Sequence, residues 1–327
     1  MTHFVHEPVL PQAVLQYLPP AHGTRYIDGT VGGGGHAELL LQHRAQAFVL
    51  GLDCDEEAVT AARERLRSFS DRCEIRHANY ADFRGEAEQL GWQGADGILL
   101  DLGVSSHQLD TAARGFSHRH DGPLDMRMNR RNPRTAARIL NRAPREELER
   151  IFREYGEERR ARALARAVVR RREERPWART ADFAELTEEV VGRSRHGPPP
   201  ATRAFQALRI AVNDELRVLR ETLAGMVDFL HPGGRLVVIS FHSLEDRIVK
   251  HFFRYEAAEC VCPPGMPECR CEKVSRLQVL TPKPVRPDDE ELSHNRRSAP
   301  ARLRAAEKLE CRPRIPNSAP QTRHSRR

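Results

Sequence analysis

The stretch that decides the fold reads RYIDGTVGGGGHAELLL and runs from Arg25 to Leu41. Its first four residues end a short apolar strand, four successive glycines follow at 32–35, and a helical pattern opens at Ala37. The glycines remove every Cβ where a ligand must approach the backbone, and the first turn of a helix offers free N–H groups. This order predicts a ligand crevice at the carboxyl edge of a parallel sheet, in preference to a flexible turn.

Short apolar runs alternate with helical patterns on both sides of this stretch, as they do in βαβ units. Strands are expected at residues 25–28, 48–53, 73–77, 97–101 and 236–240. Residues 56–66 between them form an amphipathic helical pattern. The sequence therefore predicts an α/β fold with a doubly wound, open and mostly parallel sheet.

The strand pattern stops after Leu102 for about a hundred residues, far longer than an ordinary βα loop. Apolar residues at helical spacing predict three helices in this interval. They are marked by Leu148, Ile151, Phe152 and Tyr155, by Ala161, Leu164, Ala165 and Val168, and by Phe183, Leu186 and Val190. After the prolines at 198–200, residues 205–223 predict one long helix that returns to the sheet.

The composition narrows the class of protein. A net charge of +7 over 327 residues favours a polyanionic partner, because Lys and Arg displace counterions from phosphates; an arginine-rich composition without such a partner is the alternative. No stretch approaches the roughly 20 apolar residues of a membrane span, and the N-terminus lacks a signal-peptide pattern. Seven cysteines, an odd number, argue against a secreted disulfide scaffold. We expect a cytoplasmic protein without a membrane partner.

The glycine turn alone does not identify its ligand. Gly32, Gly34 and Ala37 also fit the looser dinucleotide pattern of dehydrogenases. Asp28 argues against a dinucleotide, since its carboxylate would repel a pyrophosphate but could meet the cationic amine of a methionine moiety. Asp53, at the end of the second expected strand, suits ribose hydroxyls in either case.

A second acidic residue, Asp101, ends the fourth expected strand and is followed by Leu-Gly-Val-Ser-Ser, with Gln108 just beyond. A carboxylate at this edge points into the crevice, where reacting groups are held. The alternative is an Asp that only caps the next turn.

Five groups of residues, taken in chain order, resemble the motifs of the MraW/RsmH family, the bacterial small-subunit ribosomal RNA cytosine-N4 methyltransferases. They are DGTVGGGGH at 28–36, GILLDLGVSS at 97–106, GFS at 115–117 with DGPLDMRM at 121–128, YGEER at 155–159, and ISFHSLEDRIVK at 239–250. The resemblance runs from about His6 to Lys308. His107 departs from the family pattern, where a proline is common, and NRRS at 295–298 is a variant of the usual Asn-Pro-Arg run.

The resemblance implies a class I methyltransferase with an inserted helical domain. It would use S-adenosylmethionine to methylate N4 of a cytidine in the decoding region of 16S ribosomal RNA, with ribosomal RNA or the small ribosomal subunit as partner. By the same resemblance the methyl donor is held by Gly34, Gly35, His36, Asp53, Tyr80, Asp101 and Gln108. Whether the protein is a homodimer, and whether the RNA is free or assembled, stays open.

On this basis the chain divides into four parts. Residues 1–108 and 202–310 form the two parts of the methyltransferase domain, 109–201 form the inserted substrate-recognition domain, and 311–327 form a disordered basic tail. An RNA-binding assembly protein with an inactive methyltransferase fold is the non-enzymatic alternative. The intact glycines and Asp53 argue against it.

Asp101 is the catalytic candidate, because an acceptor that binds the N–H of the cytosine amine would take its proton late in methyl transfer. The main-chain carbonyls of 102–105 are rivals. The candidates for contact with the substrate are Ser105, Ser106, Arg127, His242, Arg170 and Arg171. Residues 159–179 hold nine arginines and two acids, which favours an RNA-backbone face over the alternative of a solvated helix face.

Two further patterns have competing interpretations. His242, Ser243 and Asp246 have the residue types of a hydrolase triad, but a capping box from Ser243 to Asp246 explains them better. Cys260, Cys262, Cys269 and Cys271 form two C-x-C pairs that could close a structural zinc site, although paired zinc ligands are usually two residues apart. Incidental reduced cysteines are the alternative, so the sequence assigns no metal.

Overall fold

The computed structural model describes residues 8–19, 22–192, 199–263 and 269–310, so the predicted disordered tail at 311–327 lies outside the described residues. A seven-stranded sheet has the order β3-β2-β1-β4-β5-β7-β6. The strands are β1 (Arg25–Asp28), β2 (Phe48–Asp53), β3 (Cys73–His77), β4 (Ala95–Asp101), β5 (Leu230–Ser240), β6 (Leu277–Val279) and β7 (Arg302–Lys308). β1 to β5 are parallel, whereas β7 pairs antiparallel with β5 and β6 with β7. The predicted α/β fold is confirmed.

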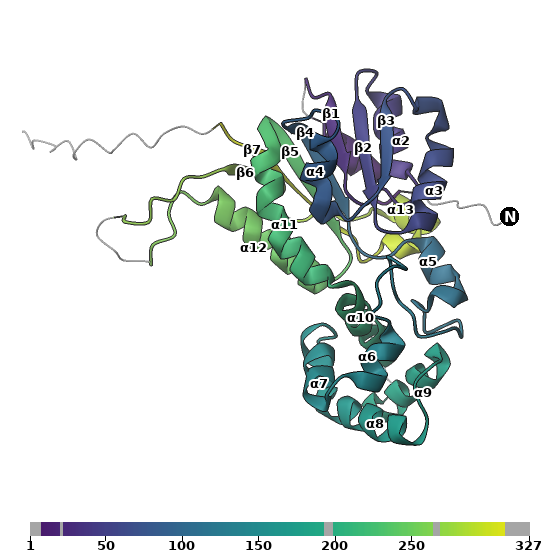
Figure 1. Cartoon of the computed structure of the whole chain (residues 1–327). Helices are drawn as coiled ribbons and strands as arrows, with labels where there is room; N and C mark the ends of the chain where they lie inside the picture. The colour runs from purple at the N-terminus through teal and green to yellow at the C-terminus, as the bar shows by residue number, and fades with distance from the viewer. Residues whose placement is uncertain (1–7, 20–21, 193–198, 264–268, 311–327) are drawn as a thin grey trace, which may run out of the picture.

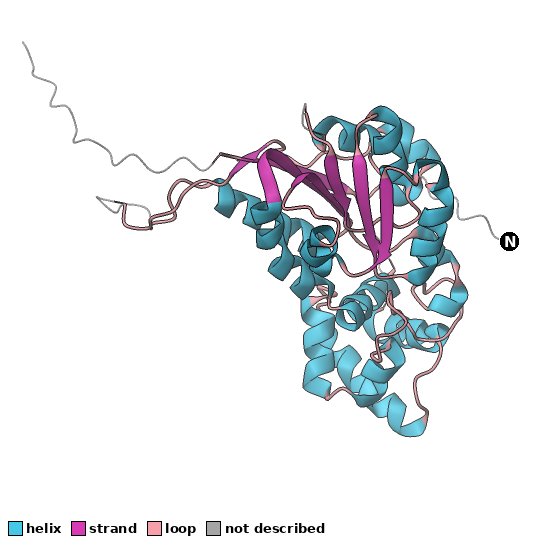
Figure 2. Cartoon of the chain, turned by 45° about the horizontal axis from the view of Figure 1, so that its top comes forward, coloured by secondary structure: helices cyan, strands magenta, loops and turns pink. Residues whose placement is uncertain are grey.

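Helices cover both faces of this sheet (Figures 1 and 2). Those packed on or beside it are α1 (Pro11–Tyr17), α2 (Gly35–His43), α3 (Glu56–Arg65), α4 (Phe83–Glu88), α5 (Ser106–Asp110), α11 (Glu215–Phe229), α12 (Ser243–Ala257) and α13 (Asp289–His294). In the described part of the chain, no helix combines the length and the apolar composition that a membrane crossing requires.

The central strands are apolar along most of their length because both of their faces are buried. Ile27, Leu50 and Ile98 belong to the core that α4, α11 and α12 cover. Their neighbours in the chain, such as Tyr26 and Val49, point to the opposite face, where α1, α2 and α3 pack. Successive apolar side chains of each strand thus point to opposite faces of the sheet, so each strand packs against a helical layer on both sides.

The inserted helices form a separate hydrophobic core beyond the carboxyl ends of the strands (Figure 1). They are α6 (Ala136–Arg142), α7 (Arg145–Glu154), α8 (Ala161–Glu174), α9 (Thr180–Val191) and α10 (Pro200–Asn213). The three predicted helices correspond to α7, α8 and α9, whereas α6 was not predicted. Phe205 of α10 lies in this core with Phe152 and Phe183. We therefore propose that the helical unit extends to Asn213, beyond the boundary expected at residue 201.

The single long helix predicted for 205–223 is wrong, because the chain breaks at Asp214 between α10 and α11. Asp214 has a φ of +56°, in the left-handed region that Asp tolerates better than most residues. Asn213 donates from Nδ2 to the carbonyl of Met126 at 2.8 Å and accepts from the N–H of Met128 at 2.8 Å. The apolar spacing continues through the break because α10 buries its apolar side in the helical unit and α11 on the sheet.

The buried guanidinium of Arg114 joins the helical unit to the sheet. Only 2% of this side chain is exposed. It lies 2.8 Å from carboxylate oxygens of both Asp55 and Glu57, next to β2, and donates to the carbonyls of Arg127 and Met128 at 3.0 and 3.2 Å. The segment that leads into the insertion is therefore tied to the end of a strand.

Replacing Arg114 with Met should lower the free energy of unfolding by about 3–5 kcal/mol, because Asp55 loses its cationic partner while it stays buried. Methionine keeps much of the apolar contact with the neighbouring Phe116 ring. Urea titration checks the value. Arg162→Met, at an exposed position of α8, is the control and should change stability by no more than about 0.5 kcal/mol. Equal stability of the two variants would show that Arg114 does not hold the units together.

Candidate active site

A cleft of about 750 Å³ lies between the carboxyl ends of β1, β2 and β4 and the first inserted segment with α10. Because the strand order reverses between β1 and β4, this is the switch point where ligands of open α/β sheets bind. The volume suits a small-molecule ligand. Eight of the residues predicted from the sequence line this cleft: Gly35, His36, Asp53, Tyr80, Asp101, Ser105, Ser106 and Gln108.

The turn between β1 and α2 requires glycine for its backbone conformation as well as for the close approach of a ligand to the backbone. Gly32 and Gly34 have φ values of +52° and +81°, which side-chain-bearing residues rarely adopt. Gly32 lines the cleft, whereas Gly34 does not. A Cβ on Gly34 would lie 3.2 Å from the side chain of Leu66 on the far side of the turn. Gly34 thus shapes the turn, and the contact predicted between it and the ligand is not supported by its position.

Asp53 ends β2 with its carboxylate fixed by two backbone N–H groups, from Gly32 at 2.9 Å and from Asp55 at 2.8 Å. Burial raises the pKa of Asp53 to about 6, even though these two hydrogen bonds favour the ionised form. Asp28, at the end of β1, is more deeply buried, and burial raises its pKa to about 7. Asp53 lines the cleft, whereas Asp28 does not. A cationic or hydroxyl-bearing ligand bound at this edge of the sheet would favour their ionised, carboxylate forms.

Asp101 ends β4 with its N–H donating to Thr30 Oγ1 at 2.6 Å, so the glycine turn fixes its backbone. Its Oδ2 lies 3.5 Å from Nε2 of His36, which is too long for a good hydrogen bond. Asp101 Oδ1 and both ring nitrogens of His36 are buried without a hydrogen-bond partner among the described residues. Buried polar atoms are rarely left unsatisfied, so this pair is positioned to bind a ligand.

Tyr80 lies at the start of a short 3₁₀ helix, Tyr80–Asp82, after β3. Asn79 caps this turn, its Oδ1 accepting from the N–H of Ala81 at 2.9 Å. Burial raises the pKa of Tyr80 far above its ordinary value, so the phenol stays neutral at the wall of the cleft. A neutral aromatic wall beyond Asp53 suits a flat, uncharged group such as adenine.

Gln108 lines the cleft, but its side-chain amide is used within the protein. Its Oε1 accepts from the N–H of Ser105 at 3.0 Å, and its Nε2 donates to Asp55 at 2.7 Å. Ser105 Oγ accepts in return from the N–H of Gln108, completing a capping box at the start of α5. His107, which replaces the usual proline, lies 3.1 Å from Glu57 and so keeps the loop attached to α3. These contacts make Gln108 a residue that positions the loop.

Four of the predicted substrate residues, Arg127, His242, Arg170 and Arg171, are not among the residues that line the cleft. The guanidinium of Arg127 donates to both carboxylate oxygens of Asp125 and to nearby carbonyls, which holds the segment before α6. Arg170 and Arg171 lie on α8, at the end of the helical unit farthest from the sheet (Figure 1). Arg171 stacks over the ring of Trp177 at 5.6 Å.

His242 is the N-cap of α12, so the capping box predicted from Ser243 to Asp246 is wrong by one residue. The box joins His242 to Glu245, whose carboxylate accepts from the N–H of Phe241 at 2.9 Å. Sequence reasoning was misled because Ser is the commoner cap. Asp246 is instead paired with Arg304 at 2.6 Å, which separates it from Ser243 and removes the hydrolase triad.

Sequence reasoning missed an ionic cluster that lines the cleft and forms where α10, α11 and α12 meet. Arg209 donates to both carboxylate oxygens of Glu215, at 2.9 and 2.8 Å, and lies 3.9 Å from Glu245. Burial alone would raise the pKa of Glu245, but the charges of His242 and Arg209 hold it below its ordinary value. The helix break at Asp214 brings these groups together, and the sequence shows no signal for it.

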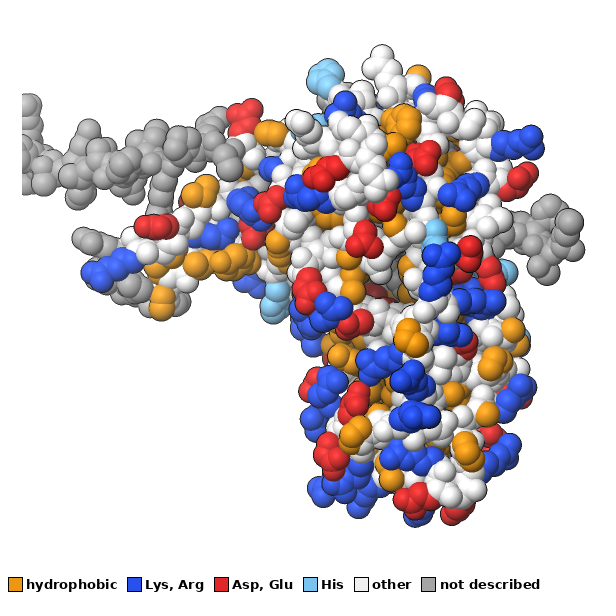
Figure 3. Space-filling model, in the orientation of Figure 1, with side chains coloured by type: hydrophobic (Ala, Val, Ile, Leu, Met, Phe, Trp, Pro, Cys, Tyr) orange, Lys and Arg blue, Asp and Glu red, His pale blue; other side chains and the backbone are white. Residues whose placement is uncertain are grey.

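Exposed cations at the mouth of the cleft were also missed. Arg119 and His120 project from the segment before α6, and Arg296 from the turn after α13. On the face shown in Figure 3, Lys and Arg side chains are dense over the helical unit and its junction with the sheet. The signal in the sequence was the basic run His-Arg-His at 118–120, which lies between the quoted stretches 115–117 and 121–128.

Known proteins similar to this chain agree with the geometry. The sequence profile of the MraW methylase family matches residues 3–309. A protein of Carboxydothermus hydrogenoformans named ribosomal RNA small subunit methyltransferase H is 52% identical over 307 residues, covering 94% of this chain and 98% of its own length. One of the same name from Thermomicrobium roseum is 51% identical over 305 residues, covering 93% and 94%.

Among solved structures, an rRNA methylase from Streptococcus thermophilus covers 92% of this chain and 94% of its own at 10% identity, but its TM-score of 0.40 is too low to support an argument. The family profile and the close relatives decide the question. With the profile spanning nearly its whole length and half of its residues shared with such relatives, this chain belongs to the MraW methylase family.

Proposed function

We propose that this protein transfers the methyl group of S-adenosylmethionine to N4 of a cytidine in the decoding region of 16S ribosomal RNA, in the cytoplasm. The observation that carries the proposal is the unsatisfied pair of His36 and Asp101 in a cleft at the switch point of a methylase sheet. The relatives named as small-subunit ribosomal RNA methyltransferases support the choice of RNA.

The residues of the cleft fit this methyl donor. Asp53 would accept hydrogen bonds from the ribose hydroxyls, Tyr80 would cover the adenine, and the turn with Gly32 and Gly35 would hold the methionine part. The buried Asp28 behind the turn favours a cation there. When bound, S-adenosylmethionine supplies an electrophilic methyl group on a positively charged sulfur.

The chain's own contribution to the reaction is orientation and proton acceptance. The lone pair of the cytosine amine is delocalised into the ring, so a hydrogen-bond acceptor on its N–H makes the nitrogen a better nucleophile. Asp101 Oδ1 is buried, free of partners among the described residues, and fixed at the end of β4. It would take the proton that the amine loses when the nitrogen–methyl bond forms.

The experiment that tests the proposed function is mass spectrometry of 16S ribosomal RNA from a strain that lacks the gene. Decoding-region fragments should lose one methyl group located on a cytidine base, and the gene supplied in trans should restore it. Unchanged fragments would contradict the substrate. Binding of S-adenosylmethionine to the pure protein separates a wrong substrate from an inactive scaffold.

Asp101→Asn should fold normally but methylate RNA about 10²–10⁴ times more slowly, because an amide oxygen is a far weaker proton acceptor than a carboxylate. Single-turnover measurements with saturating S-adenosylmethionine give the rate. Asp71→Asn, at an exposed position before β3 and outside the cleft lining, is the matched control. A near-parental rate for Asp101→Asn would transfer the role to the main-chain carbonyls of residues 102–105.

Affinity for S-adenosylmethionine should depend on pH through Asp53. The carboxylate of Asp53 becomes protonated as the pH falls through about 6. A ribose hydroxyl donates a stronger hydrogen bond to the ionised carboxylate than to the protonated acid, so affinity falls with the pH. Protonation of this one group should weaken binding about tenfold between pH 7 and pH 5. Asp53→Asn should bind more weakly at pH 7 and lose that tenfold dependence, as titration calorimetry would show. Glu221→Gln, exposed on α11, should behave like the parent, and an unchanged profile in Asp53→Asn would assign the titration elsewhere.

We further propose that RNA reaches the cleft across its basic mouth. Arg119→Gln and Arg296→Gln should each weaken RNA binding and reduce the slope of log affinity against log salt by about 0.7, the value for one phosphate contact with a single strand. Arg170→Gln, exposed on α8, is the matched comparison. A reduced slope for Arg170→Gln alone would place the RNA on α8 instead.

A further inference from the structure

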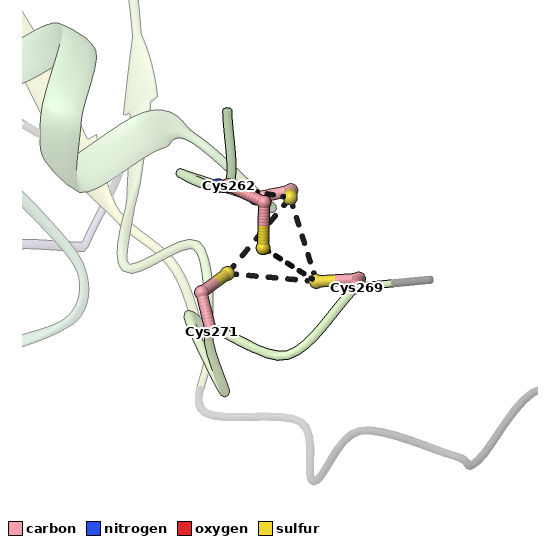
Figure 4. A group of neighbouring side chains, drawn as sticks. Cys262, Cys269 and Cys271 are labelled. Carbon is pink, nitrogen blue, oxygen red and sulfur yellow. Dashed lines mark hydrogen bonds between the residues drawn. The ribbon is translucent and has the colours of Figure 1, made fainter. Parts of the chain in front are cut away.

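Four cysteines lie together on the arm that projects between α12 and β6, away from the cleft (Figures 1 and 4). The sulfur of Cys269 lies 3.4 Å from Cys260, 3.5 Å from Cys271 and 3.9 Å from Cys262, and Cys271 lies 3.8 Å from Cys260. All four sulfurs are within 4.8 Å of one another. Side chains from two separate C-x-C pairs thus converge on one point.

These distances match a single metal ion held by four thiolates. Zinc–sulfur bonds of about 2.3 Å in a tetrahedron place neighbouring sulfurs about 3.8 Å apart. A disulfide would need a separation of about 2.05 Å, far shorter than the sulfur–sulfur distances found here. The one-residue spacing within each pair, unusual for zinc, does not prevent the four sulfurs from meeting.

Backbone N–H groups around the cluster also favour thiolates. Val261 donates to the sulfur of Cys271 at 3.3 Å, Cys262 to that of Cys260 at 3.4 Å, and Arg270 to that of Cys262 at 3.4 Å. Hydrogen bonds of this kind orient the ligands of a metal site and spread their negative charge. They come from both described segments of the arm, 258–263 and 269–276.

The arm has no hydrophobic core that could hold it in this conformation. No described residue of the segments 258–263 and 269–276 is buried. Val261 and Val274 are 43% and 38% exposed. A small element without a core needs a covalent or metal crosslink to keep a defined fold.

We propose that Cys260, Cys262, Cys269 and Cys271 bind one structural zinc ion that holds the arm together. All four coordination positions are filled by protein sulfurs, so the ion has no open site for catalysis. The site lies outside the cleft, and it does not depend on the proposed function.

Metal analysis of protein purified without chelator tests the proposal. The parent should contain one zinc ion per chain, and Cys262→Ser combined with Cys269→Ser should contain almost none while keeping the parent's affinity for S-adenosylmethionine. Cobalt in place of zinc should give the strong visible absorption of a tetrahedral thiolate site. Loss of the metal should make the arm more sensitive to limited proteolysis.

Cys73→Ser is the matched control, because β3 forms the opposite edge of the sheet from β6, and it should retain zinc. If the double variant folds poorly, the parent decides the question through zinc released when a mercurial reagent blocks its thiols. A metal-free parent with four freely reactive thiols would overturn the proposal. So would an intact mass lowered by two hydrogens per disulfide.

Discussion

The crowding of carboxylates at the ends of three neighbouring strands is the constraint on which the rest of this structure depends. Parallel strands bring Asp28, Asp53 and Asp101 to one edge, where burial opposes the ionisation of Asp28 and Asp53. Backbone N–H groups of the glycine turn and of the loop after β2 offset part of that cost, but no described guanidinium or ammonium pairs with these three acids. Among the described residues these acids therefore lack a cationic partner, which a cationic ligand would supply.

The helical unit depends on the same edge for its position. Arg114 is buried because Asp55, just beyond β2, needs a cation, and the segment that carries Arg114 leads into the insertion. On the opposite wall, Arg209 of α10 joins Glu215 and Glu245 of the sheet unit. Two buried ionic contacts thus fix the two units on either side of one cleft. Buried ion pairs are costly to form but costlier to break, which favours a single arrangement of the units.

The sequence was a good guide where structure follows local patterns. Both faces of the sheet are covered, so its strands are continuous apolar runs. The glycine turn marked the ligand crevice because it lies between a strand and a helix. The sequence was a poor guide where the outcome depends on three-dimensional neighbours. The helical periodicity is the same on both sides of Asp214, so the sequence did not predict the break between α10 and α11. The Arg209 cluster depends on that break and was therefore not predicted either. Gln108 was assigned to the methyl donor by the family resemblance and Arg127 was a substrate candidate, whereas the fold uses the polar groups of both within the protein.

Asp55 and Asp101 differ in how far the fold satisfies their carboxylates. Asp55 accepts from the N–H of Glu57, from the amide of Gln108 and from Arg114, so its carboxylate is satisfied and immobile. Asp101 lies at a similar depth on the same edge, yet one of its oxygens has no partner in the described residues and the other has only a distant imidazole. A fold that supplies donors to one carboxylate could supply them to the other. Leaving Asp101 unsatisfied costs stability, and that cost is understandable where the missing partner is the substrate.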